Sequence, residues 1–324
     1  MTGSNDRGAA AVAEHCRRVY RSDVRAARRR TVGRIRKTPV FHTSVAGPTG
    51  PVPVTLKLEY LQHGGTFKVR GTLNALLTST ARTDQVVIAS AGNAGIAAAL
   101  AAAWLGKACT VVVPESAPHT KVAAMWSHGA EVLWYGTTYA EAAKHATELA
   151  AERGALQLHA YDLPAVVAGA GVVGLELEDQ VRGKPPVLVA VGGGGLVAGI
   201  AAALGRRQQV VGVEPVGLPA LHSALLANRT VDVGGPGVGL DMLGATRVGE
   251  IALDIARRYN VPSLLVTEEA ITAARDYLWR EFRIVVELAG ASALAAIQSG
   301  AYTPAPGERP VVVLCGANTD LGAL

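Results

Sequence analysis

The sequence predicts an α/β protein with two open, mainly parallel sheets flanked by helices. Apolar runs without a charge, such as VVIAS at 86–90 and CTVVV at 109–113, are typical of strands buried on both faces. Longer segments of helical composition separate these runs, and strands that alternate with helices form parallel sheets. A chain of 324 residues is long enough for two such units.

The predicted elements form two consecutive series. The first has strands at 86–90, 109–113, 131–134 and 156–159 and helices at 93–105, 119–128 and 138–152. The second has strands at 187–191, 209–213, 263–267 and 311–315 and helices at 165–181, 195–204, 218–227, 249–258, 268–280 and 289–298. Before them come a helical stretch at 15–36 and a strand candidate at 52–58, and the glycine-rich 233–244 is expected to be a loop. Chain crossings near 84 and 162 predict a large discontinuous domain, 1–84 plus 163–324, and a small domain, 85–162.

Composition excludes several classes of protein. Hydrophobic residues at 49% and charged residues at 18% describe a well-buried globular chain rather than a disordered one. The three cysteines, Cys16, Cys109 and Cys315, provide neither a disulfide framework nor a metal-ligand spacing, so a reducing, cytoplasmic compartment is expected. Two uncharged stretches of membrane-spanning length, 86–106 and 185–205, are interrupted by Gly, Ser and Asn, and no charged-then-apolar leader opens the chain. Neither a membrane span nor a secretory signal is therefore expected.

Most of the net charge of +5 comes from one segment. Residues 17–37 contain ten Arg or Lys and one acid, Asp23, which gives +9 there and leaves −4 for the rest of the chain. Such a stripe could contact nucleic acid or an acidic partner. Because aromatic residues are almost absent from it, a solvated helix face is the preferred interpretation, and no nucleic-acid partner is expected.

Lys68 lies in an unusual place for a cation. In LEYLQHGGTFKVRG, at 58–71, it follows a Gly-Gly pair and opens an apolar helical pattern. The positive end of a helix dipole lowers the pKa of an ammonium, as does burial. A lysine with a lowered pKa is a nucleophile that forms Schiff bases with aldehydes, either a substrate carbonyl or pyridoxal phosphate. The alternative is an ordinary solvated helix lysine.

Three turns fall at the carboxyl ends of predicted strands, where open α/β sheets bind ligands. They are SAGNAG at 90–95, GGGGL at 192–196 and CGAN at 315–318. Backbone N–H groups of the first two, each at the start of a helix, could hold a carboxylate or a phosphate. The alternatives are a helix N-cap at Asn93 and a buried apolar cysteine at Cys315.

The glycine run also allows a different reaction class. Gly193-x-Gly195-x-x-Ala198 satisfies a loose dinucleotide fingerprint, and Glu214 follows about 20 residues later. A nicotinamide-dependent oxidoreductase is therefore the leading alternative, although it leaves Lys68 unexplained.

Together, Lys68 and the three turns resemble the fold type II pyridoxal-phosphate enzymes, which have the tryptophan synthase β-like fold, and specifically the serine/threonine dehydratase family. The resemblance runs from RKTP at 36–39 to Asn318 and keeps the order of the motifs. The family's Ser-Phe-Lys-x-Arg-Gly element matches TFKVRG at 66–71, and its Ser-x-Gly-Asn-His-Gly element matches SAGNAG. The resemblance implies pyridoxal 5'-phosphate as cofactor, bound mainly by the large domain, an amino-acid substrate and a homodimer.

The resemblance also implies roles for individual residues. Lys68 would form the aldimine with the cofactor and would be the catalytic base. Asn93 would bond the cofactor's ring hydroxyl, the glycine loop would bind its phosphate, and Cys315 would face its pyridine nitrogen. The expected cofactor-binding residues are Phe67, Lys68, Asn93, Gly192, Gly193, Gly194, Gly195, Leu196 and Cys315. The expected substrate-binding residues are Thr66, Ser90, Ala91, Gly92, Asn93 and Ala94.

Cys315 bears on the reaction. A thiol beside the ring nitrogen does not hold that nitrogen protonated, so the ring is a weak electron sink that suits α-proton removal coupled to loss of a β-substituent. The expected activity is that of a lyase, a dehydratase and deaminase that converts a serine- or threonine-like β-hydroxy amino acid into a 2-oxo acid and ammonia. Another pyridoxal-phosphate-dependent β-elimination and an inert homologue remain as alternatives.

Several positions depart from the family pattern. Ala94 replaces a histidine, and Ala170-Gly171-Val172 replaces Gln-Gly-Thr, which predicts a changed substrate side. Ala91 stands where related racemases have a serine, so racemisation is disfavoured. The acids that place a divalent cation after Val-Glu-Pro in some relatives are missing, so no metal site is expected. The chain ends about where the family's catalytic unit ends, so no regulatory extension is expected.

Overall fold

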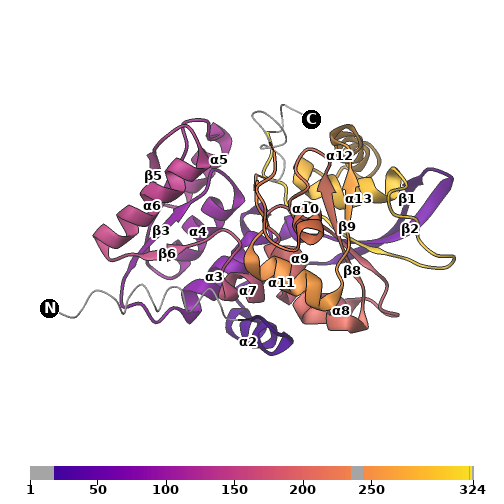
Figure 1. The fold of residues 1–324 in the computed structure, drawn as a ribbon, viewed down its shortest axis with the longest axis horizontal. Coiled ribbons are helices and arrows are strands. Elements are labelled where there is room, and N and C mark those ends of the chain that lie inside the picture. Colours follow the sequence, from indigo (N-terminus) through magenta and orange to yellow (C-terminus); the bar gives the residue numbers. More distant parts are fainter. Residues whose placement is uncertain (1–17, 235–243, 321, 323–324) are drawn as a thin grey trace.

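A computed structural model describes residues 18–234, 244–320 and 322, which form two sheets side by side (Figure 1). Within these residues, helices cover both faces of each sheet. This arrangement confirms the expected α/β class. The loop expected at 233–244 lies, from 235 to 243, outside the described residues.

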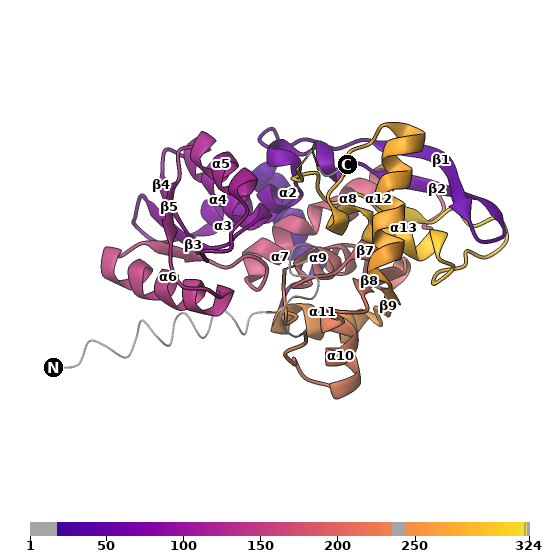
Figure 2. The same ribbon diagram turned by 90° about the horizontal axis from the view of Figure 1, so that it is seen from above.

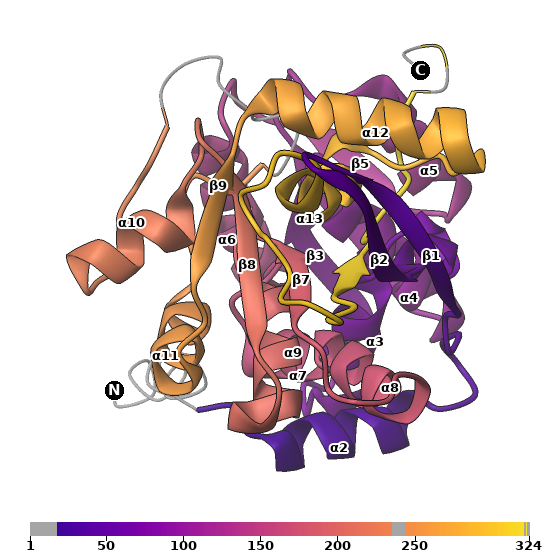
Figure 3. The same cartoon turned by 90° about the vertical axis from the view of Figure 1, so that its right-hand side faces the viewer.

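The larger sheet has six strands in the order β1-β2-β10-β7-β8-β9. Its strands are β1 (Val40–Gly47), β2 (Gly50–Lys57), β7 (Val187–Ala190), β8 (Val210–Pro215), β9 (Ser263–Val266) and β10 (Val311–Val313). Only the β1–β2 hairpin is antiparallel. Alternate residues face opposite cores (Figure 3). Val187 and Val189 pack with helix α9 (Gly195–Leu204), whereas Leu188 packs with helices α12 (Glu268–Phe282) and α13 (Leu288–Gln298).

The smaller sheet has four parallel strands in the order β5-β4-β3-β6. They are β3 (Gln85–Ala89), β4 (Ala108–Val113), β5 (Glu131–Trp134) and β6 (Leu156–Leu158). The core on one face of this sheet also contains Val69, from helix α3 (Lys68–Thr78), and Val166, from helix α7 (Pro164–Ala170). Both helices lie between the two sheets (Figure 2). The domain limits at 84 and 162 stay a prediction.

The helices follow the predicted order closely. They are α2 (Arg21–Thr31), α3 (Lys68–Thr78), α4 (Asn93–Trp104), α5 (His119–Ser127), α6 (Tyr139–Arg153), α7 (Pro164–Ala170), α8 (Val172–Gln180), α9 (Gly195–Leu204), α10 (Ala220–Ala227), α11 (Glu250–Tyr259), α12 (Glu268–Phe282) and α13 (Leu288–Gln298). Three short 3₁₀ turns lie at Glu59–Leu61, His63–Gly65 and Gly205–Arg207. None of the described helices is long and apolar enough to cross a bilayer.

The structure differs from the predicted elements in two places. Strand β1 was not predicted, because its polar residues and the prolines around the turn remove the apolar pattern of a buried strand. It is a solvated edge strand, and Val45 is its one buried residue. The helix predicted at 165–181 is divided at Gly171 into α7 and α8. A side-chain carbon on Gly171 would lie 2.5 Å from the carbonyl oxygen of Gly199, so glycine permits the junction to pack directly on α9.

The basic stripe at 17–37 is partly neutralised by acids of α8. Arg21 pairs with Glu178 at 2.6 Å, and Arg28 pairs with Asp179 at the same distance. These cations are therefore not simply a solvated face, because they help to hold α2 against α8.

Candidate active site

Lys68 is the first residue of α3 and is partly buried. Its Nζ donates a hydrogen bond to the backbone oxygen of Ala160, at 3.0 Å, and lies 5.1 Å from the ring centroid of Phe67. Within the described residues, no carboxylate lies within ion-pair distance of this ammonium. Burial lowers the pKa of Lys68 to about 8, although Cys315 and Glu287 act in the opposite direction. The amine is therefore more readily deprotonated than an exposed lysine.

A buried ion cluster fixes the start of α3. Arg70 donates from Nε to Glu59 Oε2 and from Nη1 to Glu176 Oε1, each at 2.7 Å. Lys57 Nζ donates to Glu176 Oε2 at 2.6 Å. These four side chains are almost fully buried and come from β2, the following turn, α3 and α8. The cluster therefore anchors the helix that presents Lys68.

The loop Gly192–Gly195 connects β7 to α9. Gly194 has φ of 84°, a left-handed conformation that favours glycine, and a side-chain carbon on Gly193 would lie 2.3 Å from the ring of Tyr161. Within the described part of the chain, the backbone N–H groups from Gly192 to Leu196 have no hydrogen-bond partner. Unpaired amides at a helix N-terminus can bind an anion.

The turn at 90–95 connects β3 to α4. Ser90 Oγ accepts a hydrogen bond from the N–H of Gly92, at 3.2 Å. The N-cap of α4 is Gly92 and Asn93 is the first helical residue, so the interpretation of Asn93 as a capping residue was wrong. The Asn93 side chain instead donates to Glu287 Oε1, at 2.5 Å, and accepts from Asn318 Nδ2, at 2.8 Å.

Cys315 follows β10 and lies next to the segment that precedes Lys68. Its backbone oxygen accepts from the N–H of Phe67, at 3.1 Å, and Thr66 pairs with Gly316. Burial, reinforced by Glu287, raises the pKa of the Cys315 thiol to about 12. At neutral pH the group is therefore an uncharged thiol.

Sequence reasoning missed Glu287, which lies against Gly316 and contacts Asn93. It also missed Lys121, whose Nζ lies 3.6 Å from Glu287 Oε2, and Tyr161, whose ring lies against Gly193. A signal for Glu287 exists, since it is the only charge in the apolar run IVVELAGASALAAI at 284–297. A lone acid in such a run is expected to be buried and paired.

The positions at which this chain departs from the family pattern lie in apolar surroundings. Ala94 is buried in the core beside the smaller sheet, where the partly buried Ala91 also packs, and Ala170 is buried in the core around α9. Glu214, the acid of the dinucleotide alternative, is fully buried and accepts from the N–H groups of Leu221 and His222. Its carboxylate is thus already used to hold the start of α10, which does not favour that alternative.

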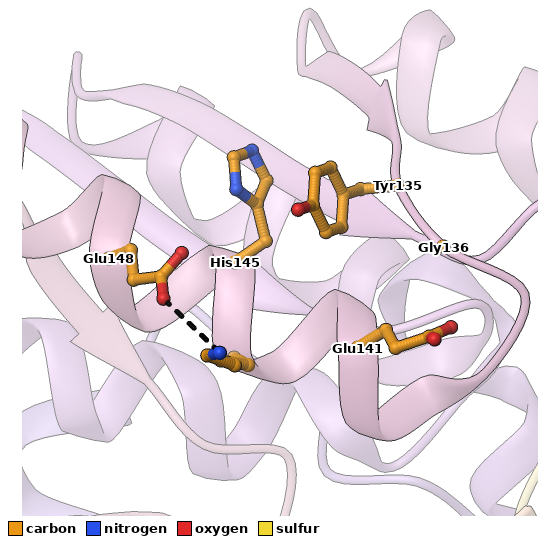
Figure 4. A pocket seen from close by; sticks show the side chains of 6 residues that line it. Tyr135, Gly136, Glu141, His145 and Glu148 are labelled. Carbon is orange, nitrogen blue, oxygen red and sulfur yellow. Dashed lines mark ion pairs between the residues drawn. The ribbon is translucent and has the colours of Figure 1, made fainter.

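Two surface hollows do not include Lys68 or the three turns. One, of about 300 Å³, lies beside α6, where Tyr135 stacks on His145 and Lys144 pairs with Glu148 (Figure 4). The other, of about 550 Å³, lies near His42 and Arg182, at the amino ends of β7 and β10. Among the described residues, no group of three or more His, Cys, Asp or Glu is arranged to hold a metal ion.

The pyridoxal-phosphate dependent enzyme family model matches residues 32–316. The chain belongs to this family. It is 37% identical over 294 residues to an L-threonine ammonia-lyase of Geobacter sulfurreducens, covering 89% of this chain and 73% of that protein. It is 34% identical over 296 residues to a phenylserine dehydratase of Ralstonia pickettii, covering 88% and 89%. Among solved structures, a serine racemase of Dictyostelium discoideum aligns with a TM-score of 0.82 at 30% identity, covering 94% of this chain and 99% of that one.

The cofactor of the family is pyridoxal phosphate, and the residues present fit it. Lys68 offers an amine with a lowered pKa and, among the described residues, no carboxylate in ion-pair contact. The glycine loop offers amides suited to the phosphate. Glu287 brings two further groups together. It accepts a hydrogen bond from the amide of Asn93, and it lies against Gly316, the neighbour of Cys315 with its neutral thiol. The chain is therefore a pyridoxal-phosphate-dependent lyase by family and by chemistry.

Proposed function

We propose that this chain is a dehydratase that converts a β-hydroxy amino acid into a 2-oxo acid and ammonia. The observation that supports it best is Lys68, a partly buried lysine with a lowered pKa whose ammonium bonds a backbone oxygen rather than an acid. Its relatives named threonine ammonia-lyase and phenylserine dehydratase both suggest such a substrate.

Bound pyridoxal phosphate supplies an aldehyde for the amino group and a ring that accepts the electron pair left at the α-carbon. In the proposed mechanism, the free Nζ of Lys68 takes the α-proton as general base. The bond between the β-carbon and its oxygen then breaks, and the hydroxyl takes up a proton supplied near the cofactor phosphate and leaves as water. Hydrolysis of the released enamino acid takes up one water and gives the 2-oxo acid and ammonia, so the atoms balance.

The other side chains are assigned supporting roles. Residues 192–196 would bind the cofactor phosphate through backbone N–H groups, with Phe67 beside Lys68. Asn93 would donate to the ring hydroxyl, and Cys315 would lie near the ring nitrogen without protonating it. Ser90, with the amides of the turn at 90–95 and with Thr66, binds the substrate carboxylate.

The substrate side chain is proposed to be as large as or larger than that of threonine. Ala94 replaces the histidine of the family motif with a methyl group, and both Ala91 and Ala94 lie in apolar surroundings, so the turn proposed to contact the substrate is less polar and less crowded. A panel of serine, threonine and phenylserine, assayed for release of 2-oxo acid and ammonia, tests this. Turnover of serine alone would contradict the proposed preference. Absence of product release from all three amino acids would favour another β-elimination or an inert homologue.

The cofactor assignment has a direct spectroscopic test. Purified protein is expected to absorb near ~410–420 nm, and borohydride should bleach this band. Lys68→Ala should remove both the band and turnover, whereas Lys144→Ala, at an exposed position, should change neither. A Lys68→Ala variant that keeps both the visible band and turnover would contradict the assignment of Lys68 as the cofactor-binding and catalytic lysine. A colourless protein that retains a nicotinamide dinucleotide would favour the oxidoreductase.

We also propose that the protein is a cytoplasmic homodimer. The family resemblance and the scarcity of cysteine support these two statements. Light scattering of the purified protein should give twice the chain mass of 33.4 kDa, and a monomer mass would overturn the dimer.

A further inference from the structure

Glu287 joins elements that pack on different sheets. It precedes α13, which covers the six-stranded sheet, and its side chain is 10% exposed. Oε1 accepts from Asn93 at the start of α4, at 2.5 Å, and Oε2 lies 3.6 Å from Nζ of Lys121 in α5. Helices α4 and α5 both pack on the four-stranded sheet. A single buried carboxylate thus connects the two halves of the site.

The charge of Glu287 also decides how the Asn93 amide is turned. An ionised carboxylate can only accept hydrogen bonds, so Asn93 must direct its NH₂ group to Glu287. Its oxygen is then left for Asn318 Nδ2, which donates at 2.8 Å and also donates to the backbone oxygen of Gly64. Among the described residues, the second N–H of Asn93 has no partner in this chain of hydrogen bonds.

We propose that Glu287 is a positioning residue that holds Asn93 as a hydrogen-bond donor toward the cofactor ring and ties Lys121 across the site. This inference rests on the proposed function, because it assigns the remaining N–H of Asn93 to the ring hydroxyl.

The placement of Glu287 costs folding free energy. Burial raises its pKa, whereas Lys121, Asn93 and Lys68 act to lower it, and the thiol of Cys315 is the other titratable group facing it. An acid whose pKa is raised on folding destabilises the folded state once it ionises. A buried acid that lowers stability beside a reactive lysine is typical of a functional position.

Glu214 provides a matched control. Its carboxylate is also buried, and burial likewise raises its pKa. It accepts from the N–H groups of Leu221 and His222 and from Ser263 Oγ, and it is not part of the candidate site. Replacing it by glutamine makes the same chemical change at a structural position.

The test compares Glu287→Gln, Glu287→Asp and Glu214→Gln by pyridoxal phosphate titration of the apoprotein, by the visible spectrum across pH and by apoprotein melting. Glu287→Gln should weaken cofactor binding about tenfold or more and change the balance of absorbing forms, because its amide no longer orients Asn93. The melting temperature of its apoprotein should stay the same or rise. Glu287→Asp, which keeps the charge, should bind more tightly than Glu287→Gln.

Glu214→Gln should bind the cofactor as the unmodified protein does. A Glu287→Gln protein with unchanged affinity and spectrum would overturn the inference while leaving the proposed function intact. An unmodified protein that takes up no pyridoxal phosphate would overturn the proposed function and the inference together.

Discussion

Lys68 combines two properties that a surface lysine lacks, a lowered pKa and a fixed position. The first comes from burial, and the second comes from its place at the first turn of α3 and its bond to Ala160. Both are needed for an amine that must lose a proton and attack a carbonyl.

The pKa of about 8 predicts the pH dependence of the apoprotein. Labelling of Lys68 by an acylating reagent should rise with a midpoint near pH 8, well below that expected for exposed lysines. Mass spectrometry of peptides after brief labelling would measure this. A midpoint equal to that of the exposed lysines would contradict the burial argument.

The same shift has a consequence for stability. Because the folded pKa lies below the unfolded one, protonated Lys68 destabilises the fold below pH 8, and the effect fades as the pH rises toward 10.5. Lys68→Met should therefore stabilise the apoprotein at pH 7, by about 1–3 kcal/mol after allowance for partial exposure. Urea denaturation at pH 7 and pH 10 measures this, and a gain that did not shrink at the higher pH would contradict the charge argument.

At the scale of elements, the ion cluster of Arg70, Glu59, Glu176 and Lys57 holds α3 against β2 and α8. Buried ion pairs add little net stability when intact, but removing one partner leaves an uncompensated charge. We therefore propose that the main role of the ion cluster is to fix the direction of α3 at Lys68.

Arg70→Met is expected to lower the unfolding free energy by about 3–5 kcal/mol, because Glu59 and Glu176 lose their main cation. The control is Arg153→Met, which breaks the exposed pair with Glu131 and should cost at most about 1 kcal/mol. Urea denaturation of both apoproteins measures the difference. Equal losses would show that the cluster is no more important than a surface pair.

At the scale of the whole molecule, the candidate site draws on both sheets. Lys68 and Asn93 begin helices that border the smaller sheet, whereas the glycine loop and Cys315 follow strands of the larger one. A cofactor bound by all four would link the two halves.

Cofactor binding is therefore expected to stabilise the whole molecule. At a free concentration 100 times Kd, the linkage term is about 2.7 kcal/mol. Calorimetry should show one transition that rises with added pyridoxal phosphate, and Lys68→Ala should reduce the shift. Two transitions, of which only one responds, would indicate that the cofactor contacts a single half.

The sequence by itself determined the order and type of nearly all helices and strands, because apolar periodicity is a local property. It also placed Lys68 and the three turns, since each is a short motif. Tertiary structure alone decided that α7 and α8 separate at Gly171, where two backbones meet. It alone revealed Glu287, Tyr161 and the contact of Arg70 with Glu176, because these depend on residues about 30 to 200 positions apart. Burial and pairing across such distances set the charge state of a site, and no local pattern encodes them.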